Sequence, residues 1–278
     1  KIQASSSDPG TAYIAFTGHF HDDFRPYIFK TMDSGDSWES ITGDMPDEAV
    51  VMAVAEHPDN PNLLFAGVHN GLMISMKGGR NWTRAGGNLP PVSVNDIRVK
   101  NGDLVLATYG RGFLILDDIG FLEGLTEEAL AEDAYLFPIR DTEAYYLNNR
   151  DLSNKAARYA GPNPDYGALI TYYLKDGPSS SGVSGEAAAS DPLQVTLQVL
   201  DGSGMVIREL TGPDREGFNR IAWDLRRTPD EAANAAGAQA GRRQRMTEVE
   251  PGQYTVKLMA RGEEMIQPVT VVPDKRRR

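Results

Sequence analysis

Residues Thr31–Trp38 read TMDSGDSW and residues Ser75–Trp82 read SMKGGRNW, so two short polar loops of similar plan each end at a tryptophan. The two tryptophans lie 44 residues apart. In such a loop a carboxylate accepts backbone N–H groups, a glycine takes a positive φ, and the tryptophan packs beneath the turn. A period of about 40 to 45 residues is typical of a four-stranded propeller blade. The spacing therefore predicts a repeated β fold.

The two loops differ where the carboxylate should stand. In the second loop Lys77 replaces the carboxylate and Asn81 replaces the hydroxyl. We therefore expect the second turn to keep its shape and to lose its carboxylate cap. The residues expected to build the two turns, in a structural role, are Thr31, Asp33, Gly35, Ser37, Trp38, Ser75, Gly79 and Trp82.

Aligned glycines give a second indication of the repeat. Residues Leu64–Ser75 align with Val105–Leu116, which places Gly71 opposite Gly112 at a spacing of 41. On this alignment, residues 1–120 hold about two and a half to three four-stranded blades. A closed propeller needs about four to eight blades, so we expect the remaining blades on the same or on another polypeptide. The chain also opens at Lys1 without a signal peptide, and we interpret it as a fragment.

The pattern changes after residue 120. Residues 121–167 are expected to hold a short helix capped by Thr126 and then an irregular connector. Residues 168–274 show apolar and polar residues in alternation, as in Val195–Val199, which predicts a second domain of six or seven strands. The stretches Pro178–Pro192 and Thr228–Glu248 are rich in small and polar residues and are expected to be mobile loops.

Composition excludes several classes of protein. The formal charge of −11 is spread over both halves of the chain, so neither half has the basic face that nucleic acid or an anionic membrane requires. The sequence has no cysteine, which excludes disulfides, thiolate catalysis and cysteine-ligated zinc. It also has no apolar stretch near the roughly 18 residues of a membrane span. Nothing in the sequence calls for a cofactor or a metal.

The turn at Thr31–Trp38 is an Asp-box, and its surroundings resemble the bacterial sialidase-like or sortilin-like β-propeller proteins, whose repeats are called BNR repeats. The other segments that carry the resemblance are His57–Gly67 (HPDNPNLLFAG), His21–Tyr27 (HDDFRPY) and Thr108–Asp118 (TYGRGFLILDD). The resemblance implies the C-terminal blades of a propeller over about residues 1–140. It does not imply an activity, because the family is named for its repeat.

A second resemblance concerns the end of the chain. Residues Gly217–Asp224 (GFNRIAWD) and Pro251–Val256 (PGQYTV) resemble the immunoglobulin-like or fibronectin-III-like β-sandwich of the flagellar-hook-cap type, which is found at the ends of bacterial exported proteins. Trp223 and Tyr254 are expected to be core residues. Together the two resemblances predict an all-β chain with a partial β-propeller and a β-sandwich, in a periplasmic or secreted protein.

Polar residues in loops at one end of the blades form the candidate site. The insertion Gly18–Pro26 (GHFHDDFRP) holds two histidines, two adjacent aspartates and an arginine. Three interpretations remain open for it: a network that braces the loop, a surface that binds carbohydrate or protein, or a catalytic or metal site. The candidate binding residues are His19, His21, Asp22, Asp23, Arg25, His69, Tyr109 and Arg111.

The favoured function is a non-catalytic, extracytoplasmic module for binding or assembly, which contacts a protein or glycan surface and the remaining propeller blades. The alternative is a glycoside hydrolase, sialidase-like or glucanase-like, whose catalytic acids lie mostly in the missing blades. A sialidase uses an arginine cluster, a tyrosine and an acid. Only Arg25, Tyr109 and Arg111 resemble such parts here, and they lie in separate loops. We therefore assign no catalytic residue.

Overall fold

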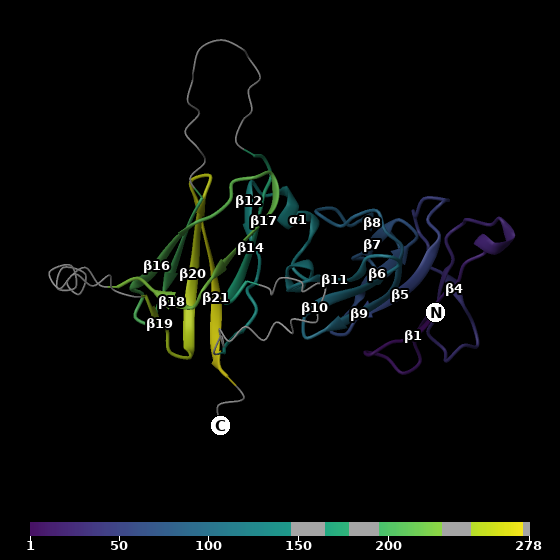
Figure 1. Ribbon diagram of the computed structural model, residues 1–278, viewed down its shortest axis with the longest axis horizontal. Helices are drawn as coiled ribbons and strands as arrows, with labels where there is room; N and C mark the ends of the chain where they lie inside the picture. Colours follow the sequence, from purple (N-terminus) through teal and green to yellow (C-terminus); the bar gives the residue numbers. More distant parts are fainter. Residues whose placement is uncertain (146–164, 178–194, 230–245, 275–278) are drawn as a thin grey trace, which may run out of the picture. The chain divides into compact units, whose positions relative to one another are not determined.

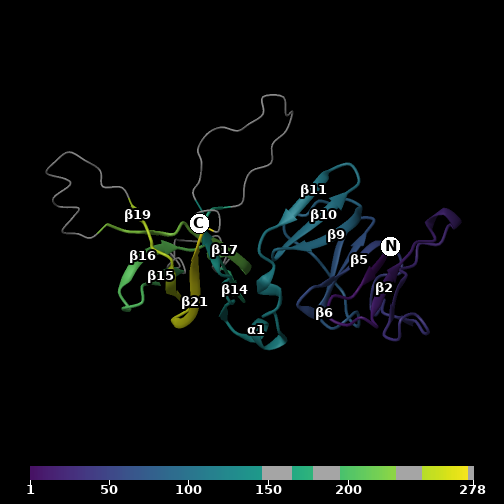
Figure 2. The ribbon, with the colours of Figure 1, turned by 90° about the horizontal axis from the view of Figure 1, so that it is seen from below.

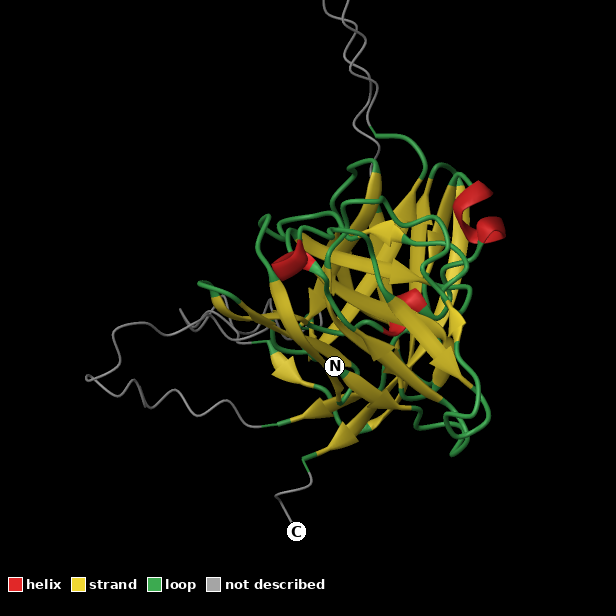
Figure 3. Cartoon of the chain, turned by 90° about the vertical axis from the view of Figure 1, so that its right-hand side faces the viewer, coloured by secondary structure: helices red, strands yellow, loops and turns green. Residues whose placement is uncertain are grey.

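The computed structural model describes residues 1–145, 165–177, 195–229 and 246–274. The chain divides into two compact units, Lys1–Glu123 and Gly124–Arg278, and each is described by itself. Strands dominate both units, and helical segments are short (Figures 1 and 3). The predicted all-β class is confirmed. The expected loop Pro178–Pro192 and most of the expected loop Thr228–Glu248 lie outside the described residues.

The first unit contains three antiparallel sheets in chain order, which we call blades one, two and three. Blade one consists of β1 (Ile2–Ala4), β2 (Ala12–Ala15), β3 (Ile28–Thr31) and β4 (Glu39–Ser40). Blade two consists of β5 (Val51–His57), β6 (Asn60–Val68), β7 (Gly71–Ser75) and β8 (Thr83–Arg84). Blade three consists of β9 (Val94–Lys100), β10 (Asp103–Thr108) and β11 (Gly112–Leu116). These sheets form the predicted partial propeller.

Each blade has two faces because side chains alternate along a strand. We call the face directed toward the following blade its second face, and the opposite one its first face. Tyr13 and Ile28 on the second face of blade one share one buried core with Ala66 and Met73 on the first face of blade two. A hydrogen bond of 2.6 Å from the Tyr13 hydroxyl to the buried Glu56 carboxylate joins the same two blades.

Blade three continues this arrangement, because β9 packs beside β5 (Figure 2). Its buried row is Ile97, Leu106 and the half-buried Leu114, which pair across the sheet. The alignment made from the sequence was wrong by one residue in β10. Thr108 pairs with Gly112, whereas Val68 pairs with Gly71, so the turn in blade three is one residue longer.

The second unit is a β-sandwich (Figure 1). One sheet has the order β12 (Ala134–Leu136), β14 (Ala168–Leu174), β17 (Gly217–Trp223). The other has the order β13 (Thr142–Ala144), β21 (Glu263–Pro273), β20 (Gly252–Ala260), β15 (Thr196–Leu200), β16 (Val206–Thr211). A small ribbon of β18 (Arg226–Arg227) and β19 (Thr247–Glu248) is separate. Buried residues of both sheets form one core, which shows that the sheets pack face to face.

Trp223 is completely buried in this core. Its ring meets the ring of Tyr254 edge to face at 5.3 Å, and its indole N–H donates to the Arg226 carbonyl at 3.0 Å. The interpretation of Trp223 as a core residue is confirmed.

In residues 124–145, which follow the blades, the structure is more regular than the sequence indicates. Helix α1 (Glu127–Ala131) begins after Thr126, whose hydroxyl accepts the Ala129 N–H at 3.2 Å, as predicted. However, β12 and β13 lie where an irregular connector was expected, and both belong to the sandwich. β12 pairs with β14, and β13 pairs in parallel with β21. Strands of three residues are too short to show a periodic pattern.

Candidate binding pocket

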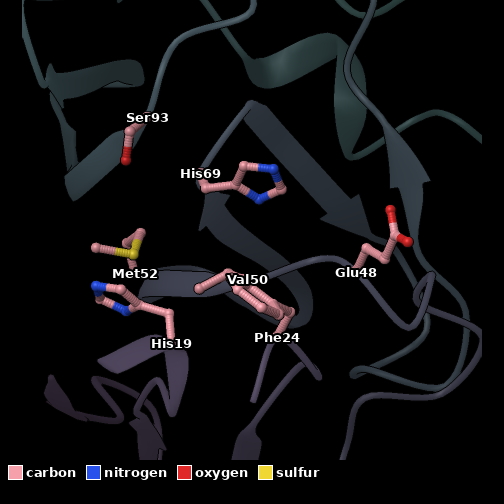
Figure 4. Close-up of a pocket in the computed structure, with 7 residues that line it drawn as sticks. All are labelled: His19, Phe24, Glu48, Val50, Met52, His69 and Ser93. Carbon is pink, nitrogen blue, oxygen red and sulfur yellow. The ribbon is translucent and has the colours of Figure 1, made fainter. Parts of the chain in front are cut away.

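A pocket of about 410 Å³ opens at one end of the blades in the first unit (Figure 4). At this end of the blades, the turns between the second and third strands approach the segments that precede the first strands, and the pocket lies between them. Its lining residues are His19, Phe24, Glu48, Val50, Met52, His69 and Ser93. Volumes of about 300 to 1,000 Å³ are common for ligand sites, so a single side chain or a sugar ring fits here.

The repeat itself builds this end of the blades. In blade two the N–H of His69, in the turn between β6 and β7, donates to the Val50 carbonyl at 3.0 Å. In blade three the N–H of Tyr109 donates in the same way to the Ser93 carbonyl at 2.9 Å. An isolated bridge between Gly71 and Ser93 joins the two blades beside the pocket. These backbone bonds fix the positions from which His69 and Ser93 reach the pocket.

The lining combines an apolar floor with a few polar groups. Val50 is almost fully buried, and the Phe24 ring is 51% exposed. In Figure 4 the His69 imidazole lies above Val50 and Phe24, between Glu48 on one side and His19 and Met52 on the other. Among the described residues that line the pocket, Glu48 carries the one carboxylate.

His19 belongs to the 3-10 segment η1 (His19–His21) of the insertion in blade one. Its Nδ1 lies 2.7 Å from the Thr17 hydroxyl oxygen, and its ring centroid lies 3.9 Å from that of Phe20. These contacts hold the imidazole at the pocket wall, whereas the Phe20 side chain is 85% exposed.

The rest of the insertion forms a bracing network. Both carboxylate oxygens of Asp23 accept hydrogen bonds from the Arg25 guanidinium, at 2.9 and 2.7 Å, and Asp23 also accepts the Tyr27 hydroxyl. The Arg25 guanidinium holds the pKa of Asp23 well below its usual value. The same carboxylate raises the pKa of Tyr27. Asp23 and Arg25 are therefore engaged with each other, and this geometry supports the bracing interpretation for them.

The structure brings together only part of the predicted candidate set. His19 and His69 line the pocket, and Asp23 and Arg25 brace the insertion. Other candidates are exposed and do not line the pocket: His21, Asp22, Tyr109 and Arg111. Five lining residues were not predicted from the sequence: Phe24, Glu48, Val50, Met52 and Ser93. Four of them have a signal in the sequence repeat, because Glu48, Val50, Met52 and Ser93 lie just before or inside β5 and β9, the first strands of their blades.

The turns at the two tryptophans share one hydrogen-bond plan. The Thr31 hydroxyl accepts the Gly35 N–H at 2.9 Å, and the Ser75 hydroxyl accepts the Gly79 N–H at 2.9 Å. In the first turn Asp33 also accepts the Ser37 N–H and hydroxyl. These bonds, led by the one from the Ser37 hydroxyl, lower the pKa of Asp33 to about 2. This geometry matches the cap expected at Asp33.

The expectation that the second turn lacks a carboxylate was wrong. Asp44, from the segment after blade one, accepts the Trp82 N–H at 2.6 Å and the Asn81 side-chain amide at 3.2 Å. The Trp82 N–H lowers the pKa of Asp44. A neighbouring segment therefore replaces the carboxylate lost at Lys77. Trp82 is buried, whereas Trp38 is 43% exposed and packs less completely than expected.

Within the described residues, no group of three or more histidine, aspartate or glutamate side chains is arranged to hold a metal ion. Among the helices in the described parts of the chain, none has the length and apolar composition needed to cross a membrane.

No protein-family model and no curated protein matches the chain. Among solved structures it is similar to the extracellular domain of the two-component system BT4673 from B. thetaiotaomicron, with 12% identity, a TM-score of 0.30, and 98% of this chain and 30% of that chain covered. It is similar to the GH74 enzyme of Niastella koreensis, with 12% identity, a TM-score of 0.34, and coverage of 96% and 38%. It is similar to YCF48 bound to a D1 peptide, with 10% identity, a TM-score of 0.33, and coverage of 96% and 80%.

The chain thus spans 30% and 38% of the length of the first two of these proteins. Likeness at these TM-scores carries no argument about function.

Proposed function

We propose that this chain is a non-catalytic binding module whose pocket at the end of the blades receives a group from a protein or glycan surface. The observation that carries the proposal is the lining of that pocket. Val50, Met52 and Phe24 offer apolar area, while His69 and Ser93 offer hydrogen-bonding groups. A mostly apolar lining with a few polar groups is the usual composition of a binding site.

The alternative, a glycoside hydrolase, requires two carboxylates on opposite sides of the scissile bond. Among the acidic residues that the structure describes, Glu48 alone lines the pocket, while Asp23 is held by Arg25 and Tyr27. This arrangement favours binding over hydrolysis for these residues. A glycoside hydrolase would require a second carboxylate from other blades.

The experiment that tests this proposal measures binding directly. The purified chain is applied to glycan and peptide arrays, and each ligand found is titrated by calorimetry. Phe24→Ala and His69→Ala should each weaken binding by about tenfold or more, as at other well-packed contact residues. The control Met205→Ala changes a side chain that is 58% exposed in the second unit and should bind normally. Equal affinity of all the variants for a ligand would contradict the pocket as its site.

We also propose the finer assignments that follow from the two resemblances: a sialidase-like or sortilin-like propeller with Asp-box turns, completed by further blades, in a periplasmic or secreted protein. For the second unit we propose an immunoglobulin-like sandwich. Two sheets that pack around one core with a fully buried tryptophan, Trp223, support this.

A further inference from the structure

A basic pocket lies between blades one and two, at the end of the blades where the tryptophan turns are. Its volume is about 390 Å³, and its lining residues are Lys30, Asn62, Met76, Lys77, Gly78 and Arg80. β7 begins beside the turn of His69 and ends at Ser75, so the basic pocket and the pocket of His69 lie at opposite ends of blade two. The two pockets share no lining residue.

The charge of this lining contrasts with the charge of the chain. Three of the lining residues are cationic, and among the described residues that line the pocket none is acidic. The whole chain carries a formal charge of −11. Cations that are gathered without a carboxylate repel one another, and a bound anion relieves that repulsion.

The internal repeat shows that the turn does not need these cations to take its shape. In the turn of blade one, Asp33 and Asp36 take the positions that Lys77 and Arg80 take in blade two. Both turns nevertheless keep the hydrogen bond from the glycine N–H to the first hydroxyl, at 2.9 Å in each. The same turn therefore carries two acids in one blade and two bases in the next, and the reversal of charge serves something other than the fold.

The backbone that carries Lys77 and Arg80 is already ordered. The Gly78 N–H donates to the Asn62 carbonyl at 2.8 Å, and the Arg80 N–H donates to the Lys77 carbonyl at 3.3 Å. A Cβ atom on Gly43 would overlap the Arg80 carbonyl, so the segment after blade one packs directly on this turn. A ligand would meet bases whose main chain is in place, which lowers the entropy cost of binding.

Lys30 brings the third cation from blade one. It alternates with Ile28 along β3, so it lies on the second face of blade one, toward blade two. Its ammonium group lies 5.6 Å from the centroid of the Tyr13 ring. The basic pocket therefore joins charges from two blades.

Acids close to these bases do not line the pocket. Glu39 pairs with Lys30 across β3 and β4 and is exposed. Asp8, whose charge interacts with Lys30, accepts hydrogen bonds from its own loop. Asp44 accepts the Trp82 N–H.

We propose that the basic pocket binds a tetrahedral oxyanion, a phosphate or sulfate group carried by a small molecule or a sugar. Such a group concentrates negative charge and offers several acceptor oxygens, which suits two ammonium groups and a guanidinium. The Asn62 amide supplies a further donor in the lining. A long polyanion such as nucleic acid is disfavoured, because the charge of −11 repels it beyond the pocket. This site is separate from the proposed function, which concerns the pocket of His69.

The test is a titration of the full chain with sodium sulfate and with sodium phosphate, followed by NMR at an ionic strength held constant with sodium chloride. The wild type should bind each anion with a Kd in the millimolar range or below. Lys77→Gln and Arg80→Gln remove one charge each and should raise that Kd by about tenfold or more. The control Lys100→Gln removes an exposed cation outside the lining and should leave the Kd unchanged. Lys30→Gln, in the other blade, gives an independent variant if a turn variant fails to fold.

A sugar phosphate and a sugar sulfate are then titrated in the same way. Binding of either ester supports the proposal, and the tighter of the two identifies the group. Binding of the inorganic anions without either ester would show an adventitious ion only and would contradict it.

Three further results would overturn the proposal. They are a wild type without saturable binding up to about 0.1 M anion, equal Kd values for Arg80→Gln and Lys100→Gln, and tighter binding of acetate than of sulfate. Because the two pockets share no lining residue, each of these results leaves the test of the His69 pocket intact.

Discussion

The charged carboxylate of Asp33 stabilises the turn that ends at Trp38. Its pKa of about 2 lies below the ordinary value of 3.8, because the charged form accepts bonds from Ser37 and Thr31. A pKa lowered by folding stabilises the folded state above pH 3.8, and this contribution is lost as the pH falls toward 2. Asp33→Ala should therefore lower the free energy of unfolding at pH 7. The difference from the wild type, followed by urea unfolding, should shrink between about pH 4 and pH 2.

Lys77 occupies the corresponding position of the second turn and provides the matched control. It is an exposed side chain, so Lys77→Ala should change the free energy of unfolding by no more than about 0.5 kcal/mol. Equal destabilisation by Asp33→Ala and Lys77→Ala would show that the carboxylate does not stabilise its turn.

Asp44 is the residue that we expect to matter for the second turn. Asp44→Ala removes the acceptor of the Trp82 N–H and leaves that group without its partner, so it should destabilise the chain more than Lys77→Ala does. Asp47 lies three residues away and is also exposed, so Asp47→Ala is the control. Thermal unfolding followed by tryptophan fluorescence compares the variants. A melting temperature no lower for Asp44→Ala than for Asp47→Ala would contradict this role.

At the scale of the elements, Gly67 in β6 sets how closely blades two and three approach. A Cβ atom at this position would overlap the backbone carbonyl of Val94 in β9. Gly67→Ala should therefore destabilise the chain by about 1 to 3 kcal/mol, as overpacking does in other cores. Gly86 has open space around its Cβ position, so Gly86→Ala should be close to neutral. Urea unfolding of both variants measures the difference, and similar values would show that the blades do not meet at Gly67.

The sequence predicted most strands because local patterns determine them. The spacing of Trp38 and Trp82 and the aligned glycines Gly71 and Gly112 located the blades within a few residues. One extra residue in the turn before Gly112 escaped notice, because a glycine alignment does not show where an insertion lies. Short β13 was missed because its partner β21 is distant in the sequence.

The candidate site was predicted less well, because segments distant in the sequence form it. The two pocket histidines were found because His19 and His69 lie in turns, where functional residues are common. Glu48 and Ser93 were missed although they precede the first strands of blades two and three, because the packing of adjacent blades decides which residues at that end meet in one pocket. Asp44 was missed because its partner Trp82 is 38 residues away.

At the scale of the whole molecule, the second unit should fold without the first. Residues 124–278 contain both sheets and a continuous core, so this fragment should unfold in one cooperative transition. A fragment of residues 165–274 lacks β12, whose Ala134 and Leu136 are buried, and it should therefore be less stable. Calorimetry of the two fragments tests this prediction. Equal stabilities would show that β12 and β13 are dispensable for the sandwich.

The central claim, that this chain binds a protein or glycan surface without cleaving it, is tested most directly by a turnover assay. The wild-type chain is incubated with sialosides and β-glucans, and released sugar is measured by mass spectrometry. Asp22→Asn combined with Asp23→Asn is assayed in parallel, because it removes the two adjacent charges of the insertion with little change in volume. The account predicts no product from either protein. Release of sugar by the wild type that is lost in the double variant would contradict it and establish a hydrolase.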